Sequence, residues 1–81
     1  MLQMSESGRI KIKMEIALFF QANPGTWETA RGIALRLGRQ AEPIGEELER
    51  LVELGLLERV GKGEQAVFHY VRPYMSSDLG A

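Results

Sequence analysis

Hydrophobic residues recur at helical spacing along the first part of the chain. Between Arg9 and Ala22 they form two stripes, Ile12, Ile16, Phe19 and Phe20 on one side and Ile10, Met14, Ala17 and Leu18 on another. Residues 9–16 also alternate as a strand would, but helix-forming residues continue without a turn residue until Asn23-Pro24-Gly25. We therefore predict one helix from Arg9 to Ala22, with Ser5-Glu6-Ser7-Gly8 before it as candidate caps.

Two further helices are predicted from their ends. Thr29 can cap a helix from Ala30 to Leu37, which Gly38 then ends. Pro43 fits the first turn of a third helix, because N–H groups there have no partner within the helix, and Gly55 ends that helix in a left-handed conformation. The predicted inner faces are Ala30, Ile33, Ala34 and Leu37, followed by Ile44, Leu48, Leu51 and Val52.

A β-hairpin is predicted to follow the third helix. Leu56–Val60 and Ala66–Val71 have strand composition, and the loop between them contains glycine. Ahead of the second helix, the turn at Asn23 leads to a short extended piece, where Trp27 is expected to close one end of the core, with an exposed partner anchor as the alternative. We expect one core to contain Ile33, Leu37, Ile44, Leu48, Leu51 and Phe68.

The two helices joined by Gly38-Arg39-Gln40, with a hairpin after Leu51–Leu57, resemble the winged helix-turn-helix of bacterial and archaeal transcription regulators. The resemblance spans roughly Lys13 to Arg72 and is strongest over Ile33–Gly38 and over Ile44, Leu48, Leu51 and Gly55-Leu56-Leu57. It implies an α+β, mostly helical fold, in which a three-helix bundle carries a C-terminal β-hairpin wing. We expect a flexible N-terminus at 1–8, the winged-helix domain at 9–72 and a C-terminal tail at 73–81, frayed unless it docks.

The resemblance also implies that the outer face of the third helix enters the major groove of double-stranded DNA while the wing contacts phosphate. The candidate DNA-binding residues are Arg31, Arg36, Arg39, Gln40, Arg50, Arg59 and Lys62. The alternative for the basic residues is scattered charge that keeps the domain soluble. The implied function is that of a small transcription-regulator-like protein.

Charge departs from what a DNA-binding domain needs. The chain has ten Lys and Arg residues and eleven Asp and Glu residues, which gives a net charge of −1. Between Ala41 and Leu54 the only cation is Arg50, against Glu42, Glu46, Glu47, Glu49 and Glu53, of which the last four are expected on the solvated side. Such an acidic helix opposes phosphate attraction. The second hypothesis is therefore a protein-interaction adaptor whose acidic third helix contacts a basic partner.

Catalytic and metal chemistry find little support in the sequence. There is no cysteine and only one histidine, His69, so thiolate zinc sites, disulfides and Cys–His catalysis are excluded. His69 is expected on the strand surface or against a partner, and Gly61-Lys62-Gly63 is interpreted as a wing turn because it lacks the spacing of a phosphate-binding loop. We expect no enzymatic activity, no cofactor and no metal.

The second stripe of the first helix, Ile10, Met14 and Leu18, would be an exposed apolar patch on an isolated domain. We expect a homodimer or another protein partner to cover it, or the tail around Tyr74 and Met75; additional core is the alternative. No apolar run approaches the roughly 20 residues that span a bilayer, and the first residues lack the features of a signal peptide. We therefore expect a cytoplasmic protein without membrane contact.

Overall fold

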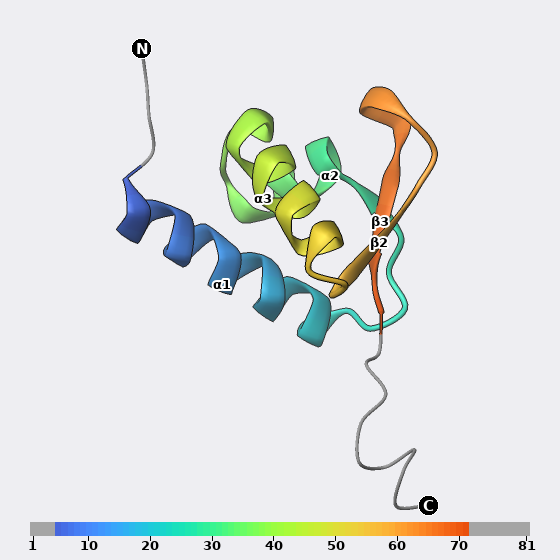
Figure 1. Cartoon of the computed structure of the whole chain (residues 1–81), viewed down its shortest axis with the longest axis horizontal. Coiled ribbons are helices and arrows are strands. Elements are labelled where there is room, and N and C mark those ends of the chain that lie inside the picture. The colour runs from blue at the N-terminus through green and yellow to red at the C-terminus, as the bar shows by residue number, and fades with distance from the viewer. Residues whose placement is uncertain (1–4, 72–81) are drawn as a thin grey trace, which may run out of the picture.

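The computed structural model describes residues 5–71. In that part of the chain lie three α-helices, α1 (Glu6–Ala22), α2 (Ala30–Leu37) and α3 (Ala41–Glu53), and three strands, β1 (Glu28–Thr29), β2 (Leu57–Val60) and β3 (Val67–Tyr70). A short 3-10 turn, η1 (Gly63–Gln65), lies between β2 and β3. Figure 1 shows α1 crossing below α2 and α3, with the β2–β3 hairpin on the right. This is the predicted α+β, mostly helical fold, laid out as a winged helix whose wing is β2, β3 and their loop.

Helix α1 begins earlier than the sequence analysis predicts, at Glu6 instead of Arg9. The Ser5 hydroxyl accepts a hydrogen bond of 3.1 Å from the backbone N–H of Gly8, which caps the first turn. Residues 5–8, expected in a flexible N-terminus, therefore belong to the cap and first turn of the helix. At the other end, the Asn23 side chain donates to the carbonyl of Phe19 at 2.8 Å and ends the helix at the predicted residue.

Helices α2 and α3 follow the predicted boundaries. Thr29 caps α2 by accepting a hydrogen bond of 3.0 Å from the N–H of Gly32, and Gly38 ends the helix in the left-handed region with φ of 69°. Gln40 is the N-cap of α3 but makes no side-chain hydrogen bond there. The short link between the two helices sets α2 against α3 as a helix-turn-helix.

The wing is part of a three-stranded antiparallel sheet with the order β1-β3-β2. Both strands of the hairpin are slightly shorter than the predicted ranges, Leu56–Val60 and Ala66–Val71. The extended piece predicted before α2 is the strand β1, in which Glu28 is opposite Phe68 and Thr29 is opposite Val67. Strand β1 thereby ties the start of α2 to the wing.

One core joins the helices and the sheet. Of the six residues expected to share it, five are buried and Leu37 is partly buried. Val52, expected on the inner face of α3, is also only partly buried. The buried residues of the core are Ile12, Ile16, Phe19, Phe20, Ile33, Ala34, Ile44, Leu48, Leu51, Leu57 and Phe68.

The sequence analysis expected Trp27 to close one end of the core, and this prediction is wrong. Its side chain is 52% exposed. Continuing the register of β1 by one residue places Trp27 opposite His69, whose side chain points away from the core because alternate strand residues face opposite sides and Phe68 points inward. The indole stacks on the imidazole of His69, with ring centroids 3.6 Å apart.

Glu47 was expected on the solvated side of the third helix, and this prediction is wrong. Its side chain is only 3% exposed. Helix α1 packs beside α3 and covers a wider arc of it than the stripe of Ile44, Leu48 and Leu51 alone. The carboxylate lies 3.9 Å from Lys13 Nζ of α1 and 3.7 Å from Arg50 Nε, one turn further along α3.

Candidate functional site

A groove separates the first turns of α3 from the wing. Its wider end is a pocket of about 540 Å³ lined by Ala30, Arg31, Ala41, Glu42 and Glu64. A second pocket of about 290 Å³ shares four of these residues and extends along α3. We call the whole the α3–wing groove; its lining residues are Ala30, Arg31, Ala41, Glu42, Gly45, Glu46, Glu49, Gly63, Glu64, Ala66 and Phe68.

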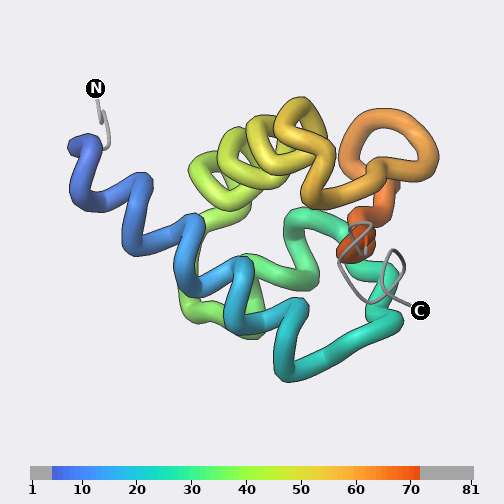
Figure 2. Tube along the Cα trace, turned by 60° about the horizontal axis from the view of Figure 1, so that its bottom comes forward, coloured from blue at the N-terminus to red at the C-terminus, as the bar shows by residue number. Residues whose placement is uncertain are grey.

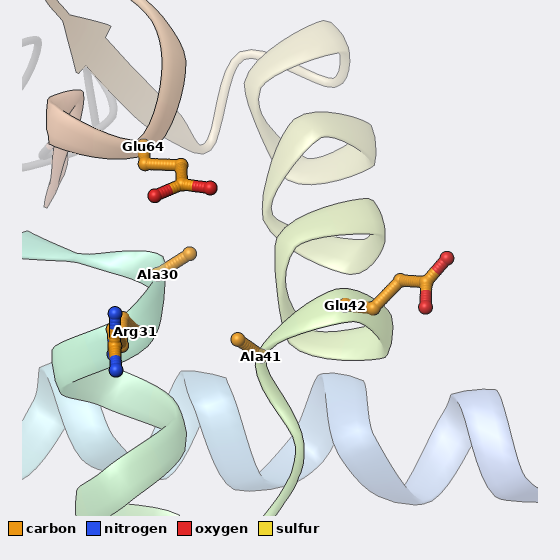
Figure 3. A pocket seen from close by; sticks show the side chains of 5 residues that line it. All are labelled: Ala30, Arg31, Ala41, Glu42 and Glu64. Atoms are coloured by element: carbon orange, nitrogen blue, oxygen red, sulfur yellow. The ribbon is translucent and has the colours of Figure 1, made fainter.

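Three elements contribute to the wide end of the groove, as Figure 3 shows. The methyl groups of Ala30 from α2 and Ala41 from α3 point into the gap, and Glu64 reaches toward it from the wing loop. Ala30 and Ala41 stand at the first positions of their helices, so the floor of the groove is made of short side chains. The groove is shallow there because Ala30 has only a methyl group and lies close to Gly45 of α3, where an added Cβ would be 3.8 Å away.

The charge of the groove is negative. Four glutamates and one arginine line it. Glu49 is paired with Arg59 at 2.8 Å, whereas Glu42, Glu46 and Glu64 make no ion pair within residues 5–71. The sequence analysis identified the acidic residues of α3 but not Glu64, whose approach to the helix depends on how the wing folds back.

The arginines expected to contact DNA mostly pair with carboxylates of the same chain. Arg36 lies 3.4 Å from Glu28, and its guanidinium is also 5.7 Å from the centroid of the Phe19 ring. Arg50 faces Glu47, on the α1 side of α3, and Arg59 forms two contacts of 2.8 Å with Glu49. These cations are therefore spread over several sides of the domain and partly neutralised.

Arg39 makes the strongest of these pairs. Its Nε and Nη2 donate hydrogen bonds of 2.6 and 2.9 Å to the two carboxylate oxygens of Glu15 on α1. This two-point contact lowers the pKa of Glu15 and raises that of Arg39, against the opposing effect of desolvation. Arg39 thus fastens the α2–α3 link to α1 instead of pointing outward to a phosphate.

The remaining candidate DNA contacts lie at the surface. Arg31 lines the wide end of the groove, and Lys62 lies in the wing loop; neither takes part in an ion pair within the described residues. Gln40 is exposed at the start of α3. Arg31 therefore lies in the first turn of α2, beside the glutamates of the groove, whereas Gln40 lies in the turn between α2 and α3 and does not line the groove.

His69 sits on the outer surface of the sheet, between two side chains. Besides stacking on Trp27, its Nε2 lies 2.7 Å from a carboxylate oxygen of Glu58 on β2. In the part of the chain that the structure describes, no group of three or more His, Cys, Asp or Glu side chains could hold a metal ion. Over the same residues, no helix has the length and apolar character required to cross a bilayer.

Comparisons of this chain with protein-family models, with curated proteins and with solved structures find no match. Its function has to be inferred from its own side chains. The feature with most bearing on it is the contrast between the paired arginines and the acidic α3–wing groove.

Proposed function

We propose that this domain is a protein-binding winged helix, without catalytic activity, that holds a positively charged segment of a partner in the α3–wing groove. One observation carries the proposal: four of the five arginines on which DNA binding would depend are paired with glutamates, while the groove beside α3 keeps unpaired carboxylates. A surface that repels phosphate attracts lysine and arginine by the same field.

The shape of the groove suits a short extended segment. Its wide pocket, about 540 Å³, falls in the range of pockets that bind small ligands, roughly 300–1,000 Å³. Ala30, Ala41 and Phe68 offer an apolar floor, and Glu42, Glu46 and Glu64 are available as acceptors along the rim. The chemistry that fits is a segment in which lysine or arginine alternates with small apolar residues, so that its cations meet the rim and its small side chains meet the floor.

DNA binding is the second candidate, and the unpaired cations Arg31 and Lys62 favour it. Arg31 at the groove and Lys62 in the wing flank the position that a duplex takes in the regulators that the sequence resembles. Two such contacts supply little of the counterion release on which non-specific affinity depends. The carboxylates between them would also have to approach the phosphates.

The experiment compares the two ligands on two matched variants. Fluorescence anisotropy would measure binding of a labelled peptide of alternating arginine and alanine, its glutamate–alanine counterpart, and a labelled DNA duplex, at low and at physiological salt. The groove variant is Glu46→Gln/Glu64→Gln. The control is Glu6→Gln/Glu53→Gln, which removes the same two charges outside the groove.

Wild type and the control variant should bind the basic peptide alike, and the groove variant should bind it about threefold to tenfold more weakly, the effect expected for two exposed ion pairs. The acidic peptide should not bind. If the duplex binds at physiological salt, and the groove variant binds it more tightly than wild type, DNA is the ligand and the proposal fails. An equal loss of peptide affinity in both variants would also contradict it, because net charge alone would then explain binding.

A further inference from the structure

The outer face of α1 carries an apolar stripe that no other side chain of residues 5–71 covers. Ile10, Met14 and Leu18 are 52%, 58% and 59% exposed. At 100° per residue they centre on Met14, which lies about 180° around the helix from the midpoint of the buried Ile12 and Ile16. The stripe therefore points directly away from the core. The exposed residues within about 60° of Met14 form what we call the outer α1 face, and they are Ser7, Ile10, Lys11, Met14, Ala17, Leu18 and Gln21.

The surroundings of this face leave room for another helix. Figure 1 shows α2 and α3 on one side of α1, and in Figures 1 and 2 the N-terminal half of α1 extends past the rest of the domain. Nothing in the described part of the chain packs on the other side. A second long helix can therefore lie along α1 without meeting the wing or α3.

The order of residues along the face has a twofold symmetry. Counting outward from Met14, Ile10 and Leu18 stand four residues away on either side, and Ser7 and Gln21 stand seven residues away. When two identical helices run antiparallel with their twofold axis at Met14, the same residues meet in reverse order, as a C2 interface requires. Ile10 of one copy then lies level with Leu18 of the other, and the two Met14 side chains meet at the centre.

We propose that two copies of this chain associate through their outer α1 faces, antiparallel, with the twofold axis at Met14. The positions of the charged side chains around the outer α1 face support a second copy of the chain as its partner. Two of the three ionisable side chains beside the centre of the stripe are turned to their own chain, Lys13 toward Glu47 and Glu15 toward Arg39. The third, Lys11, lies at the edge of the face, where its methylene groups cover Leu18 of the other copy while its ammonium group stays in water. No like charges meet at the axis.

The dimer is expected to be weak. One pair of helices of this length buries less than the roughly 800 Å² per partner of a standard stable interface. Association should therefore depend on concentration. No residue of α1 lines the α3–wing groove, so each dimer presents two open grooves and the two proposals stand or fall separately.

Engineered cysteines test the orientation, because the chain has none of its own. Under mild oxidation Met14→Cys should form a covalent dimer rapidly, since the two residues meet at the axis. Ser7→Cys should not, because its two copies lie about 21 Å apart in the antiparallel pair. The double variant Ser7→Cys/Gln21→Cys should cross-link again. Leu35→Cys, on the exposed side of α2, is the control that measures how fast cross-links form by random collision.

Sedimentation equilibrium tests the association itself. Wild type should pass from monomer to dimer with rising concentration, and Met14→Lys should raise the dissociation constant at least about tenfold, because it places two like charges at the axis. The control Leu35→Lys makes the same change at an exposed residue of α2 and should leave the constant unchanged. Cross-linking of Ser7→Cys as fast as Met14→Cys, or a wild type that stays monomeric at all concentrations, overturns the proposal and leaves residues 72–81 or another protein to cover the face.

Discussion

Replacing Glu47 by methionine should make this domain more stable. The Glu47 side chain is 3% exposed, and its oxygens are 3.7 Å from Arg50 Nε and 3.9 Å from Lys13 Nζ. Both distances are longer than a hydrogen bond, and Oε2 has no hydrogen-bond partner at all. This oxygen has thus lost its water without gaining a close donor.

The size of the stability change follows from three effects, the first of which opposes the other two. Two unit charges 4 Å apart attract by about 4 kcal/mol at an effective dielectric constant of 20, and water around the half-exposed Lys13 and Arg50 reduces this attraction further. Removing a carboxylate from water costs several kcal/mol, which offsets it. A fully buried methionine gains about 1.5–3 kcal/mol by leaving water. We expect Glu47→Met to raise the free energy of unfolding by about 1–2 kcal/mol and Tm by roughly 5–10 °C.

Urea unfolding followed by circular dichroism, at one low protein concentration, measures this difference. Glu46→Met is the matched control, because Glu46 is the exposed neighbour on the same helix; it should change stability by less than about 0.5 kcal/mol. Glu47→Gln should gain less than Glu47→Met, since its amide still lacks partners. A loss of stability in Glu47→Met would refute the reasoning and mean that Lys13 and Arg50 stabilise the carboxylate by more than its burial costs.

Two other predictions concern the folding of the domain. The hydrogen bond from Arg39 holds the pKa of Glu15 below its ordinary value of 4.5, so the stability that Glu15 contributes is complete above that value and is lost as the pH falls through the lower pKa of the folded state. The stability difference between wild type and Glu15→Gln should therefore be present at neutral pH and vanish in acid; a difference independent of pH would contradict it. Gly38→Ala should destabilise by about 1–2 kcal/mol, because φ at Gly38 is 69°, whereas Gly45→Ala, inside α3 with its nearest neighbour 3.8 Å from an added Cβ, should stabilise by up to about 1 kcal/mol. Thermal melts of both glycine variants would show whether the same added methyl group has opposite effects at the two positions.

The sequence by itself determined those features that depend on neighbours within one turn. The ends of α2 match the prediction because Thr29 caps the N–H of a residue three positions away and Gly38 needs only its own freedom at positive φ. The inner faces of α2 and α3 were predictable for the same reason, since helical spacing alone brings Ile44, Leu48 and Leu51 to one side. The early start of α1 at Glu6 was also indicated by the sequence, because its N-cap, Ser5, was among the candidate caps.

The tertiary structure decided which charged side chains and which helix faces remain available to contact a partner. Arg39 is paired with Glu15, 24 residues earlier, and Arg59 is paired with Glu49, although the sequence analysis named both arginines as candidate DNA contacts. Glu47 is buried because α1 packs beside α3, and Trp27 is exposed because the register of β1 with β3 turns it outward. Each outcome depends on contacts between segments that are far apart in the chain. Local residue patterns do not predict which of these contacts form.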